Sequence, residues 1–355
     1  ISSDSWPIYI SLQKDGILFK MRRTQDLPDK ESATMFFQDC KLSHQAQITG
    51  ISHSVKEILP PDLLDLTQLQ KEANIRYGYT ASEVYDIAQS LYEKKLISYP
   101  RTSSRYLTED VFDSLPPIMA RLLSWELFPA AKGTGGIDIS NLSRHVISAE
   151  KANVHHAIII TGIRPGNLSE KEMQVYRLVA GRMLETFMAP CRIETTNVEA
   201  VCAAQHFKAE QTRIIEAGWH DVFMRSDMVP KSGYSVNELP EVEKGDNLNV
   251  CGCNMVHKKE LPVDPFTDAE LVEYMELNGL GTVSSRTNII RTLVNRKYIR
   301  YSGKYIVPTP KGMFTYETIR GKKIADTSLT ADWEKQLTGL ESGMITGQDF
   351  LNRIR

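Results

Sequence analysis

The sequence predicts a multidomain α+β protein in which β-rich segments alternate with helical ones. The chain has 355 residues, which is enough for two to three domains. Short runs of alternating apolar and polar residues, punctuated by glycine and proline, occupy residues 1–60 and 190–262 and are typical of β-strands. Runs with apolar residues at helical spacing, opened by capping patterns, follow both segments.

The composition is that of an ordinary globular protein, with 41% hydrophobic and 24% charged residues. No apolar run approaches the length of a membrane span, about 18 residues or more, and the N-terminus has no signal-peptide pattern. Five scattered cysteines favour a reducing compartment, so we expect a cytoplasmic protein. Cys251-Gly252-Cys253 lacks zinc-site spacing, so no metal site is predicted.

Because the first residue is not Met, we expect a piece of a longer protein.

The first helical unit contains two helices in succession. The pattern Thr67–Gln70 predicts the capping box of one helix, which ends at Gly78. The pattern Thr80–Glu83 predicts a second capping box, and its helix is expected to run to about Lys95. The run Leu96–Tyr99 then predicts a short strand.

The second helical unit repeats this arrangement and adds a hairpin. Thr267–Glu270 predicts a helix start, and Gly279–Gly281 separates that helix from the next one. The runs Lys297–Tyr301 and Lys304–Val307 flank Ser302-Gly303 and predict a β-hairpin. Two helices followed by a hairpin form a winged helix, which is a common nucleic-acid-binding module.

The net charge of −2 hides a strongly basic stretch in this second unit. No acidic residue occurs between Glu276 and Glu317. The stretch carries seven cations, namely Arg286, Arg291, Arg296, Lys297, Arg300, Lys304 and Lys311. A cation-rich surface without acids favours a polyanionic partner.

The segment that begins at Tyr99 has the residues of a nucleophilic site. A tyrosine hydroxyl with a pKa of about 10 is a poor nucleophile at neutral pH. Arg101, two residues later, can stabilise charge on the phenolate or on a phosphate that it attacks. The pair therefore predicts attack on a phosphodiester, and the alternative is a tyrosine that ends a strand beside solvated arginines.

The tyrosine motif is one of five motifs whose order resembles that of the type IA DNA topoisomerases, nearest to their topoisomerase III branch. The resemblance extends from about Pro60 to the C-terminus. In chain order the motifs are Leu66–Asn74, Tyr99–Thr102, Val154–Ile159, Asn278–Arg286 and Leu329–Leu337.

The resemblance implies a toroidal core that has a β-rich arch and two helical, winged-helix-like domains. The arch would comprise residues 1–65 and 190–265. The helical domain with the tyrosine would comprise residues 66–189, and the base of the torus residues 266–355. An arch made of two pieces of chain agrees with the two β-rich segments.

The resemblance also implies a nucleoid-associated location in a bacterium, the reaction and its residues. Tyr99 would attack a phosphodiester of single-stranded DNA and stay linked to the 5′ phosphate while another strand passes, without ATP because the link conserves the bond energy. Arg101 would stabilise the phosphate and His155 would contact it. Further DNA contacts are expected from Gln89, Glu93, Ser98, Thr102, Ser104, His156, Thr282, Ser284, Ser285 and Arg286.

Two departures from the family pattern affect these expectations. Ser103 stands where the tyrosine motif usually has an acid, which removes one charge near the site. The family's Toprim domain, which binds Mg²⁺ through a glutamate and an Asp-x-Asp pair, precedes the arch, and the chain has no Asp-x-Asp. We therefore expect no cofactor within residues 1–355, Mg²⁺ in the longer protein, and a monomeric piece that binds single strands but cleaves them poorly.

Three other functions fit part of the pattern. A non-catalytic winged-helix DNA-binding protein would not need Tyr99 beside Arg101. A tyrosine recombinase needs a His-x-x-Arg element, which neither His155 nor His156 begins. A scaffold that serves as a mobile-element accessory is compatible with the same motifs.

Overall fold

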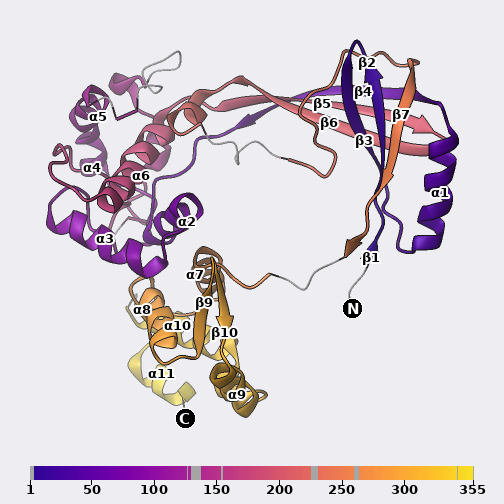
Figure 1. The fold of residues 1–355 in the computed structure, drawn as a ribbon. Helices are drawn as coiled ribbons and strands as arrows, with labels where there is room; N and C mark the ends of the chain where they lie inside the picture. Colours follow the sequence, from indigo (N-terminus) through magenta and orange to yellow (C-terminus); the bar gives the residue numbers. More distant parts are fainter. Residues whose placement is uncertain are drawn as a thin grey trace. The chain divides into compact units, whose positions relative to one another are not determined.

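The computed structural model describes residues 4–125, 127–128, 137–152, 155–224, 231–259, 264–341 and 343–354. Val154, in one of the predicted motifs, lies outside these residues. The chain divides into two compact units, one of Ile1–Pro60 and Ala189–Asp264, the other of Pro61–Met188 and Pro265–Arg355 (Figure 1). A further division of the second unit near residue 266 stays a prediction. None of the described helices combines the length and apolar character needed to cross a membrane.

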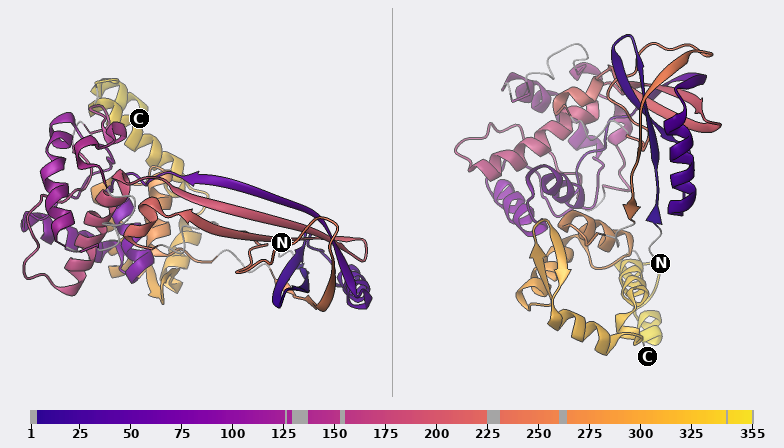
Figure 2. Two further views of the ribbon diagram at one scale, coloured as in Figure 1. Left: turned by 90° about the horizontal axis from the view of Figure 1, so that it is seen from above. Right: turned by 45° about the vertical axis from the view of Figure 1, so that its right-hand side comes forward.

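A closed antiparallel barrel with the strand order β2-β3-β6-β5-β4-β7 forms the first unit. Figure 2 shows β4, β5 and β6 as its long strands. In β2, Ile8, Ile10 and Leu12 are fully buried and alternate with partly exposed residues, as expected for a strand with one face toward a core. The strands are β2 (Ile8–Lys14), β3 (Ile17–Arg23), β4 (Gln45–Ile58), β5 (Cys191–Cys202), β6 (Gln205–Glu216) and β7 (Asn247–Met255). A short pair, β1 (Asp4–Ser5) with β8 (Lys258–Lys259), and the 3₁₀ turn η4 (Gly218–Val222) complete the unit.

Helix α1 (Lys30–Leu42) lies within the β-rich segment 1–60 and was not predicted from the sequence. The carboxylate of Asp29 accepts a hydrogen bond of 2.7 Å from the Ser32 N–H and so caps the helix. Ala33 and Cys40 are buried, and Cys40 joins the core cluster of the barrel. The helix forms because a good cap precedes apolar residues at helical spacing, which is a local signal in the sequence.

The second unit is mainly helical, and its helices α2, α3 and α6 pack on one another. Its helices and strands are α2 (Leu66–Tyr77), α3 (Ala81–Glu93), α4 (Glu109–Asp113), α5 (Leu115–Ser124), η2 (Ile139–Asn141), η3 (Arg144–Val146), α6 (Glu170–Phe187), α7 (Asp268–Leu277), α8 (Val283–Asn295), β9 (Ile299–Ser302), β10 (Tyr305–Pro308), α9 (Pro310–Ile319), η6 (Lys323–Ala325), α10 (Thr327–Glu341) and α11 (Gly347–Ile354).

The cap of α2 differs from the prediction. Asp65, not Thr67, is the N-cap, and its carboxylate accepts a 2.7 Å hydrogen bond from the Gln68 N–H. Thr67 lies within the first turn and is buried. The predicted end is confirmed, because Gly78 adopts φ 70° and continues the chain in the left-handed region that suits glycine.

The predicted capping box of α3 is confirmed, with Thr80 and Glu83 bonded reciprocally. After the helix, Lys95 adopts a positive φ of 61° and the Leu96 N–H donates to the Leu91 carbonyl at 3.0 Å, so the chain leaves in a tight turn. The predicted strand Leu96–Tyr99 is wrong, since only an isolated bridge at Ile97 forms. The run bonds to residues 159–161 through this bridge and two flanking backbone hydrogen bonds, which is too short a ladder for a strand.

The winged helix is confirmed. Thr267 and Glu270 form the capping box of α7, and α8 follows it. Strands β9 and β10 pair as an antiparallel hairpin whose turn begins at Gly303. Apolar side chains of this module and of α3 form one cluster, which contains Ala81, Val272, Met275, Ile290 and Ile306.

A buried carboxylate connects α3 with the winged helix. Asp268 accepts hydrogen bonds of 2.9 Å from the Ala81 N–H and 3.0 Å from the Tyr301 hydroxyl. Burial raises the pKa of Asp268 above its ordinary value, although both hydrogen bonds act in the opposite direction. The first turn of α3 is therefore held by a residue from the first turn of α7.

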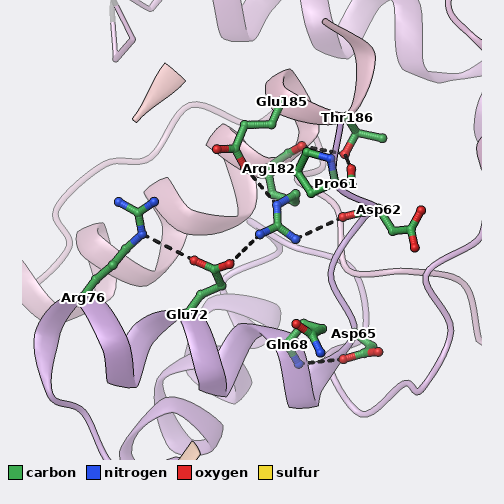
Figure 3. Close-up of polar contacts among 9 residues, drawn as sticks. All are labelled: Pro61, Asp62, Asp65, Gln68, Glu72, Arg76, Arg182, Glu185 and Thr186. Atoms are coloured by element: carbon green, nitrogen blue, oxygen red, sulfur yellow. Dashed lines mark hydrogen bonds and ion pairs between the residues drawn. The ribbon is translucent and has the colours of Figure 1, made fainter. Parts of the chain in front are cut away.

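Arg182 is the centre of a buried polar network between α2 and α6 (Figure 3). Its guanidinium donates to Glu72 at 2.7 Å, to Glu185 at 2.9 Å and to the Asp62 carbonyl at 3.1 Å. The Thr186 hydroxyl on the same helix donates to the Pro61 carbonyl at 3.0 Å. The network thus holds α2 and the chain that leads into it against α6.

Arg182→Met should destabilise the helical unit by about 3–5 kcal/mol, because it leaves the buried carboxylate of Glu185 and the partly buried one of Glu72 without their shared cation. The measurement is urea unfolding followed by circular dichroism. Arg320→Met is the matched control, since Arg320 pairs with Glu317 on the surface and should cost about 1 kcal/mol or less. Equal unfolding midpoints for the two variants would contradict the role given to Arg182.

Candidate functional site

Tyr99 lies on an irregular segment that is held by hydrogen bonds from both sides. The Ser98 hydroxyl donates to the Ala157 carbonyl and accepts from the Ile159 N–H, both at 3.0 Å. The Thr102 carbonyl accepts from the Leu66 N–H at 3.0 Å. Since the segment has no regular strand pairing, these individual bonds fix its path.

The Tyr99 ring is in contact with two other rings. Its centroid lies 4.6 Å from the His155 ring and 5.4 Å from the Tyr92 ring, which meets it edge-on. His155 is exposed and Tyr99 is half-buried. The structure therefore brings together the predicted nucleophile and the predicted site histidine, which are far apart in the sequence.

Arg101 is held against one face of α3. Its guanidinium carbon lies 5.1 Å from the centroid of the Tyr85 ring, and its Nη2 donates to Gln89 at 3.1 Å. The Gln89 amide in turn donates to Glu93 at 2.8 Å. The structure thus places Gln89 and Glu93, both predicted as DNA contacts, beside the predicted catalytic arginine.

Tyr85 and Tyr92 were not among the predicted site residues. Both follow the spacing that puts them on the face of α3 that carries Gln89 and Glu93. This spacing is visible in the sequence, but it does not say that the face meets Tyr99. Only the turn after α3 and the path of the following segment bring it there.

Three other predicted DNA contacts have polar atoms engaged by the chain itself. The Thr102 hydroxyl donates to the His155 carbonyl at 3.1 Å and accepts from the Ser104 N–H at 3.0 Å. The Ser104 hydroxyl accepts from the Tyr106 N–H at 3.1 Å. Nδ1 of His156 lies 2.7 Å from the Ala157 carbonyl. These bonds shape the segments around Tyr99 and His155.

A pocket of about 400 Å³ lies beside this segment. Ser103 and Arg105 line it together with Asp65 and with Glu276 at the end of α7. Nε of Arg105 donates to Asp65 at 2.6 Å, so the buried cap of α2 is also an ion-pair partner. Ser103, which stands in place of the usual acid, is exposed at this pocket. The pocket is where the tyrosine segment and the α7–α8 module meet.

The other group of predicted contacts lies at the start of α8. Thr282 is the N-cap, and the Ser285 hydroxyl accepts from the Thr282 N–H at 2.8 Å. Thr282 and Ser284 are exposed, and their hydroxyl oxygens lie 3.1 Å apart. A helix N-terminus with exposed hydroxyls and partial positive charge suits a phosphate group.

Arg286 adds a buried cation to this helix start. It is only 8% exposed, and Nη1 lies 3.7 Å from Glu276. Its Nε and Nη1 are buried and have no hydrogen-bond partner among the described residues. Burial lowers the pKa of Arg286 from its ordinary value. A buried guanidinium with unused donors is unusual, and a bound anion would satisfy it.

The predicted basic face is not a single surface. Arg286 is buried, and Arg291 donates to Ser82 at 2.7 Å and to Asp86 at 2.8 Å on α3. Two of the seven cations therefore serve the interior and the packing of α8 on α3. The spacing of these cations along the chain does not specify the faces on which they lie.

No group of three or more His, Cys, Asp or Glu side chains suited to a metal ion occurs in the described part of the chain. The chemistry that the described residues of the site can supply is a phenolic nucleophile, a fixed arginine, a nearby histidine and a helix start suited to an anion.

Comparison with known proteins identifies the relatives of this chain. A family described as DNA topoisomerase matches residues 1–352. DNA topoisomerase 3 of Bacillus licheniformis is 31% identical over 87% of this chain and 45% of its own length, and that of Shouchella clausii is 30% identical over 96% and 50%. Full-length topoisomerase I from Thermotoga maritima has the same fold, with a TM-score of 0.75 and 22% identity over 99% of this chain and 57% of its own. The chain spans about half the length of the curated relatives it matches.

Gly281→Ala should destabilise the start of α8 by about 1–3 kcal/mol through backbone strain and crowding. Gly281 adopts φ 70°, and a Cβ there would lie 2.8 Å from the Ser285 hydroxyl and 3.0 Å from Cδ1 of Ile289. Gly303→Ala is the control, because Gly303 has φ 60° but open space around it. Urea unfolding of both variants separates strain from crowding, and equal losses would show that crowding at Gly281 contributes nothing.

Proposed function

Because the chain belongs to the DNA topoisomerase family, we propose that it cleaves and reseals one DNA strand through a covalent link to Tyr99. The observation that carries this proposal is the contact of the Tyr99 ring with His155, 4.6 Å between centroids, next to an arginine on the same segment. We assign the activity to the type IA class, in which single-stranded DNA is the substrate.

In the proposed step the Tyr99 oxygen attacks a phosphorus atom of the strand. The bond from Oη to phosphorus forms, the bond from phosphorus to the 3′ oxygen breaks, and the phosphate stays on the 5′ end of the downstream strand. The phenolic proton leaves Tyr99 and the 3′ oxygen takes up a proton. Attack by the 3′ hydroxyl reverses the step, and no ATP is needed because the ester bond is conserved.

Arg101 would stabilise charge on the reacting phosphate, because its guanidinium is held against the Tyr85 ring and by Gln89, on the segment that carries Tyr99. His155 would contact the same phosphate, since it is the exposed member of the ring pair. Ser98, Thr102, Ser104 and His156 would act by shaping this segment as well as by any contact with DNA. Gln89 and Glu93 lie beside Arg101 and would act near it.

We propose that Thr282, Ser284, Ser285 and Arg286 bind backbone phosphates of the strand. The helix start and the unused donors of Arg286 support this assignment. Magnesium enters the proposal only through the Toprim domain that the family resemblance places before the arch. The residues 1–355 alone are then expected to bind single strands and to relax supercoiled DNA poorly, and vigorous relaxation by them would contradict that part.

Tyr99→Phe should abolish covalent trapping of a labelled single-stranded oligonucleotide while its Kd changes by about twofold or less, because only the nucleophilic oxygen is lost. The measurement is denaturing electrophoresis after incubation with and without Mg²⁺. Tyr92→Phe is the matched control, since Tyr92 touches Tyr99 and should keep the adduct. An adduct that survives in Tyr99→Phe would assign the nucleophile to another residue. Strand binding without any adduct in the natural protein that carries this chain would favour the non-catalytic winged-helix or accessory role.

Arg286→Gln should weaken binding of the same oligonucleotide and make the plot of log K against log salt shallower by about 0.7, the value for one phosphate contact on a single strand. Fluorescence anisotropy at several salt concentrations measures this slope. Arg320→Gln, on the surface beside Glu317, is the control. An unchanged slope in Arg286→Gln would remove Arg286 from the phosphate contacts.

A further inference from the structure

We propose that Tyr85 is a positioning residue for Arg101, an inference that rests on the function proposed above. The guanidinium carbon of Arg101 lies 5.1 Å from the centroid of the Tyr85 ring. At this distance the electron-rich face of a tyrosine attracts a guanidinium, and the two flat groups favour a stacked arrangement. Tyr85 thus covers one face of Arg101 and leaves the edges of the guanidinium for other partners.

A second contact fixes the rotation of Arg101 within that plane. Nη2 donates to Gln89 at 3.1 Å, and Gln89 is held by its own donation to Glu93 at 2.8 Å. The ring of Tyr85 sets the plane, and the Gln89 oxygen sets the direction of one edge. Together they define the orientation of a side chain that is otherwise long and flexible.

The Nε donor of Arg101 suits a bound acceptor. Its Nε is buried and has no hydrogen-bond partner among the residues that the structure describes. A buried donor without a partner is costly, so it points to an acceptor that binds there. A phosphate oxygen is the acceptor that suits an arginine edge and that the proposed reaction brings to this segment.

Helix α3 is well suited to hold such an array. Tyr85, Gln89 and Glu93 are spaced four residues apart and lie on one face. The capping box of Thr80 with Glu83 fixes the beginning of the helix. The positions of these side chains are therefore set before a strand binds, which lowers the ordering needed at the moment of reaction.

The proposal assigns the ring of Tyr85, and not its hydroxyl, to this task. Phenylalanine keeps the flat face, whereas leucine keeps apolar bulk but has no face to attract a cation. A role in simple packing would be met nearly as well by leucine. The two substitutions therefore separate a positioning role from a structural one.

The test compares Tyr85→Phe and Tyr85→Leu in the natural protein that carries these residues, by the rate of adduct formation on a labelled single-stranded oligonucleotide. Tyr85→Leu should lower this rate about tenfold and change the oligonucleotide affinity by about twofold or less. Tyr85→Phe should keep most of the rate. In an Arg101→Ala background, Tyr85→Leu should have no further effect. Tyr316→Leu, on the exposed part of α9, is the matched control and should leave the rate unchanged.

A second measurement does not depend on cleavage. The NMR order parameter of the Arg101 Nε–H group should fall in Tyr85→Leu and stay close to its original value in Tyr85→Phe. An unchanged order parameter in Tyr85→Leu would overturn the proposal, and so would equal losses of rate in Tyr85→Leu and Tyr85→Phe. A tenfold loss of rate on Tyr85→Leu in the Arg101→Ala background would also overturn it. If the unmodified protein forms no Tyr99 adduct at all, the proposed function fails, and the order parameter still decides the role of Tyr85.

Discussion

The arrangement of the helical unit depends on the buried charge of Arg182. A guanidinium cannot lose its proton inside a protein, so its burial requires acceptors on every side. Glu72 on α2 is one of them and the carbonyl of Asp62 is another, so the same cation fixes α2 and its entry. Asp65, between these two points, caps α2 and binds Arg105 on the segment after Tyr99. The position of the site therefore follows from the hydrogen bonds that the buried guanidinium of Arg182 makes.

Helix α3 serves the core with one face and the site with the other. Its buried residues pack on the neighbouring helices, and its polar and aromatic stripe meets the Tyr99 segment. The residues around Tyr99 then divide into two groups by what they touch. Gln89 belongs to the group that orients Arg101, and Ser98 and Thr102 belong to the group that holds the backbone. A site on an irregular segment needs both, because neither a strand ladder nor a helix fixes its direction.

The sequence predicted those features whose causes lie within a few residues. Helices α3 and α7 begin at their capping boxes, and α2 ends at Gly78, because caps and left-handed glycines act locally. The cap of α1 at Asp29 was equally local, but the alternating strands around it dominated the interpretation. The contact of Tyr85 with Arg101 and the burial of Arg286 depend on tertiary packing, which no spacing in the chain specifies. The pairing of Tyr99 with His155 was predicted only through the family resemblance.

The strand order of the barrel determines when it can form as the chain is made. Both neighbours of β4, the strands β5 and β7, come later in the sequence, and β5 begins only at Cys191. At ordinary translation speeds β4 waits on the order of 10 s after its last residue, Ile58, before it gains a partner. During that time the ribosome makes the contiguous stretch Pro61–Met188, whose helices can form by local contacts. The nascent chain therefore carries the residues of a long strand before either neighbouring strand exists, and such a segment is prone to pair with other chains.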